Sequence, residues 1–236
     1  MNGWIYDEFK HIGVDFADPQ QVQSYDARQQ TNLDNEKRLV ERLKIGAGAT
    51  VIEFGPGTCA FSLAAAMAGA QVIAVDISQA MLDYGRSKAE SAGCANIQFV
   101  HAGFLTYDHH QQAPVDFVVT KFAFHHLPDF WKAVALRRIY ALLKPGGVFY
   151  LQDVVFSFPS ADTEQYINHW INAITSDPDG SFSRADFEMH VRDEYSTFGW
   201  ILEGLLRNEG FQVSEANYYH STYAEYLCVK PSLPAS

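Results

Sequence analysis

Two glycines and one acid have the types and spacing that a nucleotide-like ligand requires. Gly55 and Gly57 lie in the segment EFGPGTCA, between a β-branched run at 50–54 and a helical stretch at 61–68. Glycine permits a positive φ and a close approach of the backbone to a ligand, and the helix that follows points free N–H groups at the same place. Asp76 ends the next apolar run, 21 residues after Gly55, where a carboxylate can accept hydrogen bonds from a ribose diol. A tight structural turn and a solvated acid are the simpler interpretation, but the joint spacing favours a nucleoside cofactor.

The glycine turn alone leaves the kind of cofactor open. The pattern Gly55-x-Gly57-x-x-Ala60 also fits the dinucleotide fingerprint, so NAD(P) remains an alternative. Three features favour another ligand. Glu53 places a carboxylate beneath the turn, within reach of an amino-acid group; about fifty residues precede the motif; and the segment LLKPGGVFYLQD leads into a late strand.

These residues need a parallel sheet to bring them together. Apolar runs alternate with helical stretches from residue 50 onward, and strands separated by single helices run mostly parallel. Two closing runs, four residues apart, predict an antiparallel hairpin. The predicted strands are 50–54, 71–75, 96–100, 116–120, 148–153, 211–218 and 222–229. The predicted helices are 34–44, 61–68, 160–176 and 197–208, together with one capped by Ser78, one capped by Asp129 and one begun by Ser183 with Asp186. The sequence thus predicts a Rossmann-like, doubly wound α/β fold with a mostly parallel seven-stranded sheet, a terminal antiparallel hairpin and a helical cover.

From residue 50 to residue 155 the sequence resembles the class I S-adenosylmethionine-dependent methyltransferases. The segments that carry the resemblance are VIEFGPGTCAFSLAAA (51–66), VIAVDISQAMLDYGR (72–86), NIQFVHAGFL (96–105), VDFVVTKFAFHHLPD (115–129) and LLKPGGVFYLQDV (142–154). Any one of them alone is weak, but together they are specific. The sequence departs from many members at Cys59, where glycine is common, and at Phe104, where aspartate is common.

The resemblance implies a role for each matching residue. Glu53, Gly55 and Gly57 would hold the methionine part of S-adenosylmethionine, and Asp76 would hold the ribose hydroxyls. The other implied cofactor-binding residues surround the adenine or form the floor near the sulfonium: Ile77 and Met81 flank the ring, Gly103 and Phe104 lie against its edge, and Lys121 belongs to the floor at 120–122. Because Phe104 lacks a carboxylate for the adenine amino group, stacking or a backbone acceptor would have to replace it.

Methyl transfer from a sulfonium mainly requires that the acceptor be aligned and water excluded. His125 and His126 follow the fourth predicted strand and are candidates for a catalytic base or for orienting a substrate, with packing as the alternative. Asp153, at the end of the fifth, is a candidate substrate ligand. Aromatic residues in 1–30 and 156–196 would cover the cleft, among them Tyr25, Trp170 and Tyr195. The scattered histidines and cysteines predict no metal site.

Composition limits the partners of the chain. Its 236 residues include 17 basic and 28 acidic side chains, a net charge of −11, which repels nucleic acids and anionic membrane surfaces. No run approaches the roughly 20 apolar residues of a bilayer-spanning helix. We therefore expect a cytoplasmic enzyme acting on a small, neutral or cationic, partly apolar molecule.

The length favours one methyltransferase domain over 1–236. Its expected parts are an N-terminal helical cover (1–45), a cofactor-binding core (46–155), a helical insert (156–196), and a last helix with the terminal hairpin (197–230). Two other functions stay open at this point: an NAD(P)-dependent oxidoreductase, and a non-catalytic subunit that binds S-adenosylmethionine. The sequence identifies neither the acceptor atom nor the oligomeric state.

Overall fold

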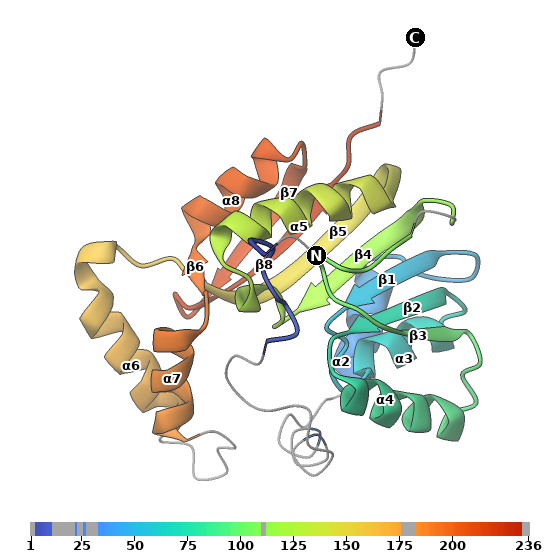
Figure 1. The fold of residues 1–236 in the computed structure, drawn as a ribbon, viewed down its shortest axis with the longest axis horizontal. Helices are drawn as coiled ribbons and strands as arrows, with labels where there is room; N and C mark the ends of the chain where they lie inside the picture. The colour runs from blue at the N-terminus through green and yellow to red at the C-terminus, as the bar shows by residue number, and fades with distance from the viewer. Residues whose placement is uncertain are drawn as a thin grey trace.

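The fold is built on one mixed β-sheet, seen in a computed structural model that describes residues 3–10, 22, 26, 33–109, 112–175 and 183–232. Its strands follow the order β3-β2-β1-β4-β5-β8-β7 (Figure 1). The strands are β1 (Thr50–Phe54), β2 (Gln71–Asp76), β3 (Ile97–His101), β4 (Val115–Lys121), β5 (Leu143–Phe156), β7 (Gln212–Tyr219) and β8 (Tyr223–Val229), with a short β6 (Thr197–Phe198) beside β5. The predicted Rossmann-like fold is therefore confirmed, with β6 added to the seven predicted strands.

Strand register decides which side chains meet at the functional edge. Strands β1 to β5 are paired in parallel, and Phe54 at the end of β1 pairs with Thr120 near the end of β4. Lys121 pairs in turn with Gln152 of β5. Because β1 lies between β2 and β4, the chain order reverses here, and the carboxyl ends of these strands bound the site where ligands bind in such sheets.

Helices cover both faces of the sheet. They are α2 (Leu33–Arg42), α3 (Ala60–Met67), α4 (Gln79–Ser91), α5 (Asp129–Leu142), α6 (Thr163–Thr175), α7 (Arg184–Asp193) and α8 (Gly199–Asn208), with short 3-10 turns η1 (Phe124–His126) and η2 (Ser160–Asp162). In Figure 1, α5 and α8 lie in front of the sheet, α2 and α3 lie behind it, and α6 and α7 project together to one side. Among the described residues, no helix is long and apolar enough to span a membrane.

The alternation of side chains along the strands explains the two layers. Ile52 of β1 belongs to a buried cluster with Leu136 of α5 and Leu206 of α8. Its neighbour Val51 belongs to a second cluster, with Val40 of α2 and Phe61 of α3. Successive strand residues point to opposite faces, so each strand contributes to both cores and the sheet edge is held rigidly from two sides.

Local signals predicted most boundaries, and one predicted cap is wrong. Ser78 caps α4 by accepting a hydrogen bond from Met81 N, and Ser183 with Asp186 forms the expected capping box of α7. Asp129, predicted to cap α5, is instead its first residue, and Pro128 is the cap. The Asp129 carboxylate instead accepts hydrogen bonds from Lys132 Nζ of the same helix and from the distant Thr197 Oγ1.

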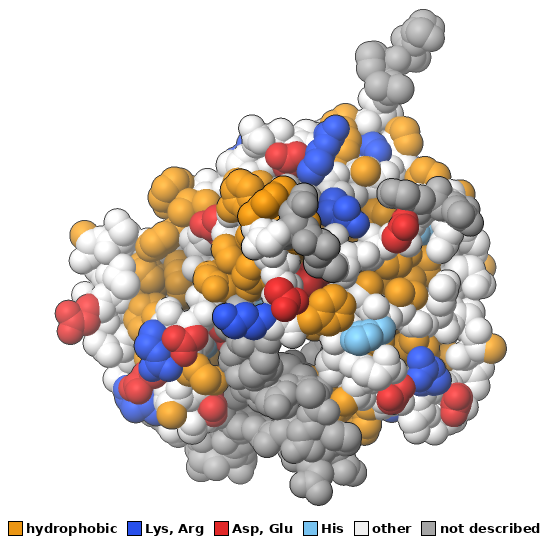
Figure 2. Space-filling model, viewed as in Figure 1, with side chains coloured by type: hydrophobic (Ala, Val, Ile, Leu, Met, Phe, Trp, Pro, Cys, Tyr) orange, Lys and Arg blue, Asp and Glu red, His pale blue; other side chains and the backbone are white. Residues whose placement is uncertain are grey.

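Hydrophobic side chains also reach the surface. On the face in Figure 2 they gather over α5 and α8. Phe130 and Trp200 are two of the exposed aromatic residues of these helices, and Trp4 stacks on Trp131 with ring centres 6.2 Å apart. The N-terminal segment 3–10 thus packs over the start of α5 rather than standing free.

Candidate functional site

The glycine turn between β1 and α3 has the backbone that its sequence predicts. Gly55 and Gly57 have φ angles of +65° and +52°, a region that favours glycine. A Cβ at Gly55 would lie 2.4 Å from Cβ of Ala123, so the turn also touches the segment after β4. Gly55 N donates to Val75 O at 2.9 Å, which fixes the turn to β2.

Cys59 takes over a left-handed position without disturbing the turn. It caps α3 with a φ of +64°, a conformation that costs about 1–2 kcal/mol for a residue with a Cβ. Its sulfur fills the space beside Gly85 of α4, where an added Cβ would come within 2.2 Å of Sγ. The pair Cys59 and Gly85 therefore explains how this chain dispenses with a glycine at 59.

Glu53 lies buried directly beneath the turn. Its carboxylate accepts a hydrogen bond from Ser62 Oγ at 2.5 Å, and Glu53 as a whole is only 2% exposed. Burial raises the pKa of Glu53 to about 7, against the opposing effects of the Ser62 hydrogen bond and the charge of Lys121. A carboxyl group so poorly solvated is stabilised by any ligand that offers hydrogen-bond donors or positive charge.

Asp76 lies on the other side of the turn, at the end of β2. Its carboxylate accepts a hydrogen bond from Ser78 N at 2.8 Å, and backbone groups of Gly57 and Ile77 also stabilise its charge. Burial nevertheless raises the pKa of Asp76 to about 6. The two carboxylates thus bracket the turn, one beneath it and one at the end of the neighbouring strand.

The residues assigned to the adenine by resemblance follow β2 and β3. Ile77 is 38% exposed beside Asp76, whereas Met81 is buried in the first turn of α4. The Phe104 ring stacks on Phe54 at 4.9 Å and is edge-on to Phe124 at 5.2 Å, so its side chain packs into the core.

Glu8 brings a carboxylate to this end of the site. It accepts hydrogen bonds from Leu105 N and from Thr106 Oγ1, the latter at 2.7 Å, and it is 7% exposed. A Cβ at Gly103 would lie 2.3 Å from its Oε2, so the absence of a side chain there admits the Glu8 carboxylate. Sequence reasoning missed Glu8 because it lies about a hundred residues away in the chain.

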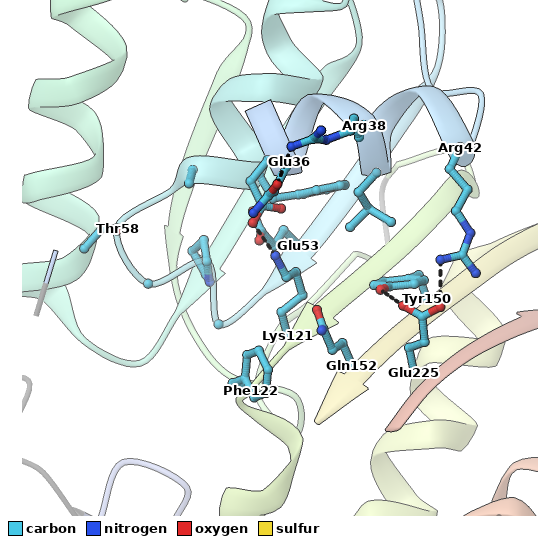
Figure 3. A pocket seen from close by; sticks show the side chains of 17 residues that line it. Glu36, Arg38, Arg42, Glu53, Thr58, Lys121, Phe122, Tyr150, Gln152 and Glu225 are labelled. Atoms are coloured by element: carbon cyan, nitrogen blue, oxygen red, sulfur yellow. Dashed lines mark hydrogen bonds and ion pairs between the residues drawn. The ribbon is translucent and has the colours of Figure 1, made fainter. Parts of the chain in front are cut away.

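A cavity of about 480 Å³ opens between α2 and the carboxyl ends of β1, β4 and β5. Figure 3 shows Glu36 reaching in from α2 toward Lys121 of β4, with Glu53 beneath them. The Lys121 Nζ to Glu36 Oε1 distance is 2.5 Å, while Glu36 Oε2 is buried with no hydrogen-bond partner among the described residues. Glu36 is a second acid that the sequence did not single out.

Phe122 bounds the same cavity in a strained conformation. Its φ is +52°, rare for a bulky side chain, and the residue is 41% exposed. The strain is held by the sheet, since Phe122 N donates to Gln152 O at 2.8 Å. Strained residues of this kind cluster at functional sites.

The cavity lining does not include Asp76, Ile77, Met81, Gly103 or Phe104, which lie across the turn from it.

His125 lies at the carboxyl ends of β4 and β5 with both ring nitrogens facing carboxylates. Nδ1 contacts Asp153 Oδ1, and Nε2 lies 3.1 Å from Glu194 Oε2. Although burial alone would lower it, the two acids raise the pKa of His125 to about 9. In this arrangement neither nitrogen is free to take a proton from an acceptor. His126 packs against it, with ring centres 4.3 Å apart, and burial followed by the charge of His125 lowers its pKa to about 3.

The residues predicted to cover the substrate have different surroundings. Trp170 is buried, and its Nε1 donates to the Tyr223 hydroxyl at 3.0 Å. Tyr195 is 37% exposed, and its backbone N donates to His125 O at 2.8 Å. Asp153 is engaged by His125 rather than exposed to a cleft, and Tyr25 lies outside the described residues.

Comparisons with known proteins agree on one family. A methyltransferase-domain family matches residues 51–147. An uncharacterised methyltransferase of Geobacillus sp. (strain WCH70) is 29% identical over 209 residues, covering 88% of this chain and 91% of its own, and one from Bacillus mycoides is 24% identical over 93% of both chains. The crystal structure of a SAM-dependent methyltransferase from Aquifex aeolicus shares the fold at 15% identity, with a TM-score of 0.63 over 90% of this chain and 98% of that one. Together with the glycine turn and its two acids, these likenesses support a class I S-adenosylmethionine-dependent methyltransferase.

Proposed function

We propose that the protein transfers the methyl group of S-adenosylmethionine to a small-molecule acceptor at the carboxyl edge of β1, β4 and β5. The observation that carries the proposal is the pair of buried, poorly solvated carboxylates on the two sides of the glycine turn, Glu53 and Asp76. When bound, S-adenosylmethionine supplies an electrophilic methyl group on a sulfonium. The task of the chain is then to hold, align and dehydrate the reactants.

The cavity next to α2 suits the amino-acid end of the cofactor. Glu36 Oε2, which has no hydrogen-bond partner among the described residues, can accept from an ammonium group. Glu53 supports the turn from below, and Lys121 and Arg38 offer cations to a carboxylate. Gly55 and Gly57 leave the backbone open to close approach, because neither has a side chain over the turn.

The nucleoside end is assigned to the other side of the turn. Asp76 would accept from the ribose hydroxyls, and Ile77 and Met81 would lie along the adenine. Gly103 and the backbone of Phe104 would meet the adenine edge, since the Phe104 ring is committed to the core. Glu8 then supplies the carboxylate that position 104 lacks, because its oxygens already lie at Gly103 and Leu105.

The acceptor would lie against Phe122 and Gln152, above the end of β4. The net charge of −11 favours a neutral or cationic molecule over a nucleic acid. Of the predicted catalytic pair, His125 is held between two acids and His126 has a low pKa, so neither is arranged as a strong base. We therefore propose catalysis by alignment, with Phe122 shaping the apolar wall and no proton transfer required for an acceptor that is already nucleophilic.

Calorimetry on the full chain tests the assignment. S-adenosylmethionine and S-adenosylhomocysteine are expected to bind at micromolar concentrations, and NAD is not. Asp76→Ala should weaken binding by about 10- to 100-fold, the scale of a charge-assisted hydrogen bond. Asp83→Ala, on the exposed surface of α4, is the matched control and should bind normally.

Unchanged affinity in Asp76→Ala would refute the contact between Asp76 and the ribose. Tight binding of NAD would refute the assignment of S-adenosylmethionine as the cofactor. A screen with methyl-labelled S-adenosylmethionine and small acceptors then separates an enzyme from a subunit that only binds the cofactor. Transfer to any acceptor supports the proposal, whereas methylation of a nucleic acid in place of small molecules would contradict the charge argument.

A further inference from the structure

Three potential metal ligands converge beside the site without having been needed for the methyl-transfer proposal. His125 comes from η1, and His190 and Glu194 come from the end of α7. Each offers one ligand atom, and these atoms lie within 4.8 Å of one another. Glu194 Oε2 is 3.1 Å from His125 Nε2 and also contacts His190 Nδ1.

Each histidine is oriented by a hydrogen bond to its other ring nitrogen. His125 Nδ1 bonds to Asp153, and His190 Nε2 lies 2.8 Å from Ser196 Oγ. Asp153 is itself fixed, since its second oxygen accepts from His125 N at 2.9 Å. Metal-binding histidines carry such outer partners, which set the tautomer and leave the inward nitrogen free to ligate.

The charges of the cluster also match a divalent ion. Asp153 and Glu194 are buried carboxylates, with side chains 3% and 8% exposed. Lys132, a neighbouring cation, is engaged by Asp129 and by the carbonyl oxygen of Tyr195. If both imidazoles are neutral, one divalent cation balances the two negative charges of Asp153 and Glu194. Without the ion, protons on the histidine rings must supply that positive charge.

We propose that His125 Nε2, His190 Nδ1 and the Glu194 carboxylate bind one divalent transition-metal ion, with zinc as the best match. Two imidazoles and a carboxylate are a donor set of zinc sites that keep one position open. Zinc–ligand distances near 2.0–2.1 Å in a tetrahedron put ligand atoms about 3.3 Å apart. The observed 3.1 Å between Nε2 and Oε2 is close to this spacing, while Glu194 Oε2 would have to move away from His190 Nδ1 to admit the ion.

The surroundings are those of an enclosed site. The His126 ring packs on His125, and the Trp170 ring is edge-on to His190 at 5.7 Å. The His190 side chain, 13% exposed, is the most accessible of the three. A bound ion would hold the end of α7 against η1, two residues beyond Phe122.

Zinc titration of the chelator-treated full chain, followed by calorimetry and by elemental analysis after gel filtration, tests the site. Wild type should bind one zinc ion per chain with a dissociation constant below about 1 μM. His190→Gln and Glu194→Gln should each weaken binding at least 100-fold, and Asp153→Asn, which removes the charge that orients His125 but no ligand atom, should weaken it about 10- to 100-fold. His169→Gln, on the exposed face of α6, is the matched control and should bind as wild type does.

Far-UV circular dichroism of every variant separates lost ligands from lost folding. Zinc should also raise the melting temperature of wild type and of His169→Gln, but not that of Glu194→Gln. The proposal is overturned if wild type shows no saturable zinc binding and no thermal shift, or if the folded His190 and Glu194 variants bind zinc as tightly as wild type. Cofactor affinity, measured without zinc, remains a separate test of the methyltransferase assignment.

Discussion

Two pairs of buried carboxylates lie near the same edge of the sheet and differ in their partners. At the glycine turn, burial raises the pKa of Glu53 to about 7 and that of Asp76 to about 6, more than nearby cations and hydrogen bonds lower it. At the histidine cluster, burial acts in the same direction on Asp153 and Glu194, yet His125 and its neighbours hold the pKa of both acids below the ordinary range.

The acids at the glycine turn lack a matched cation in the described part of the chain, whereas the acids at the histidine cluster are already paired with histidines. A buried carboxyl group without a matched cation gains stability when a ligand brings donors or positive charge to it. One that is held by histidines is destabilised when such a partner is removed and no other cation replaces it. The turn pair is therefore the better candidate for direct contact with an organic ligand, and the cluster pair is the better candidate for holding α7 to the sheet, through its histidines or through the proposed metal ion.

The largest expected effect comes from filling the turn itself. Gly57→Val should reduce S-adenosylmethionine binding by more than about 100-fold, because a branched Cβ would occupy the space left for the ligand. Gly93→Val is matched for strain, since Gly93 also has a positive φ, of +69°, with no atom near its Cβ position. Calorimetry should show loss of binding in Gly57→Val but not in Gly93→Val. If the two variants bind S-adenosylmethionine equally well, the turn has only a structural role.

Removing the charge of one acid from each pair should affect stability very differently. Asp153→Asn removes one of the two buried carboxylates that face His125 and should lower the free energy of unfolding by about 3 kcal/mol. Asp76→Asn removes a poorly solvated charge and should change it by less than about 1 kcal/mol. Urea unfolding at neutral pH measures both. Equal losses would show that the two pairs are not distinct.

The pH dependence of stability should show the raised pKa of Glu53. Because the folded state binds this proton more tightly than the unfolded state, the group favours the fold at low pH, and this contribution is lost as pH rises from about 4.5 to about 7. Relative to Glu53→Gln, wild type should lose about 2–3 kcal/mol across that window. Urea unfolding at several pH values measures it, with surface Glu164→Gln as a control that should parallel wild type.

The smallest effect is expected at Glu8. If its carboxylate accepts from the adenine amino group, Glu8→Gln should weaken S-adenosylmethionine binding by about 3- to 10-fold, near 1 kcal/mol for one hydrogen bond. Glu164→Gln should leave the affinity unchanged in the same titration. Tighter binding in Glu8→Gln would mean that Glu8 competes with the cofactor for Leu105 N instead of contacting it.

The glycine turn was predictable because its determinants are consecutive in the chain. Residues 50–57 and Asp76 carry their own strand, turn and spacing signals, and the caps at Ser78 and Ser183 are equally local. The terminal hairpin followed from two apolar runs with a short gap, and β7 and β8 do pair antiparallel.

The rest of the site depends on tertiary contacts that no local pattern reports. Glu8 reaches Leu105, and Glu36 reaches Lys121, from segments that precede β1. The His190-x-x-x-Glu194 spacing, one helical turn apart, was a usable signal, but nothing in the sequence indicates that His125 lies opposite it. Asp129 shows the same limit, since its side chain does not cap α5 but accepts hydrogen bonds from Lys132 and from the distant Thr197.

The fit of Cys59 against Gly85 has a consequence for chemical labelling. The Cys59 thiol is buried, and burial followed by the nearby acids raises its pKa, so very little thiolate is available to a maleimide or an iodoacetamide while the turn is closed. Its sulfur becomes reachable only when the turn separates from α4. The rate at which Cys59 is alkylated therefore times the opening of the ligand-binding turn, and a ligand that holds the turn closed slows that reaction in proportion to its occupancy.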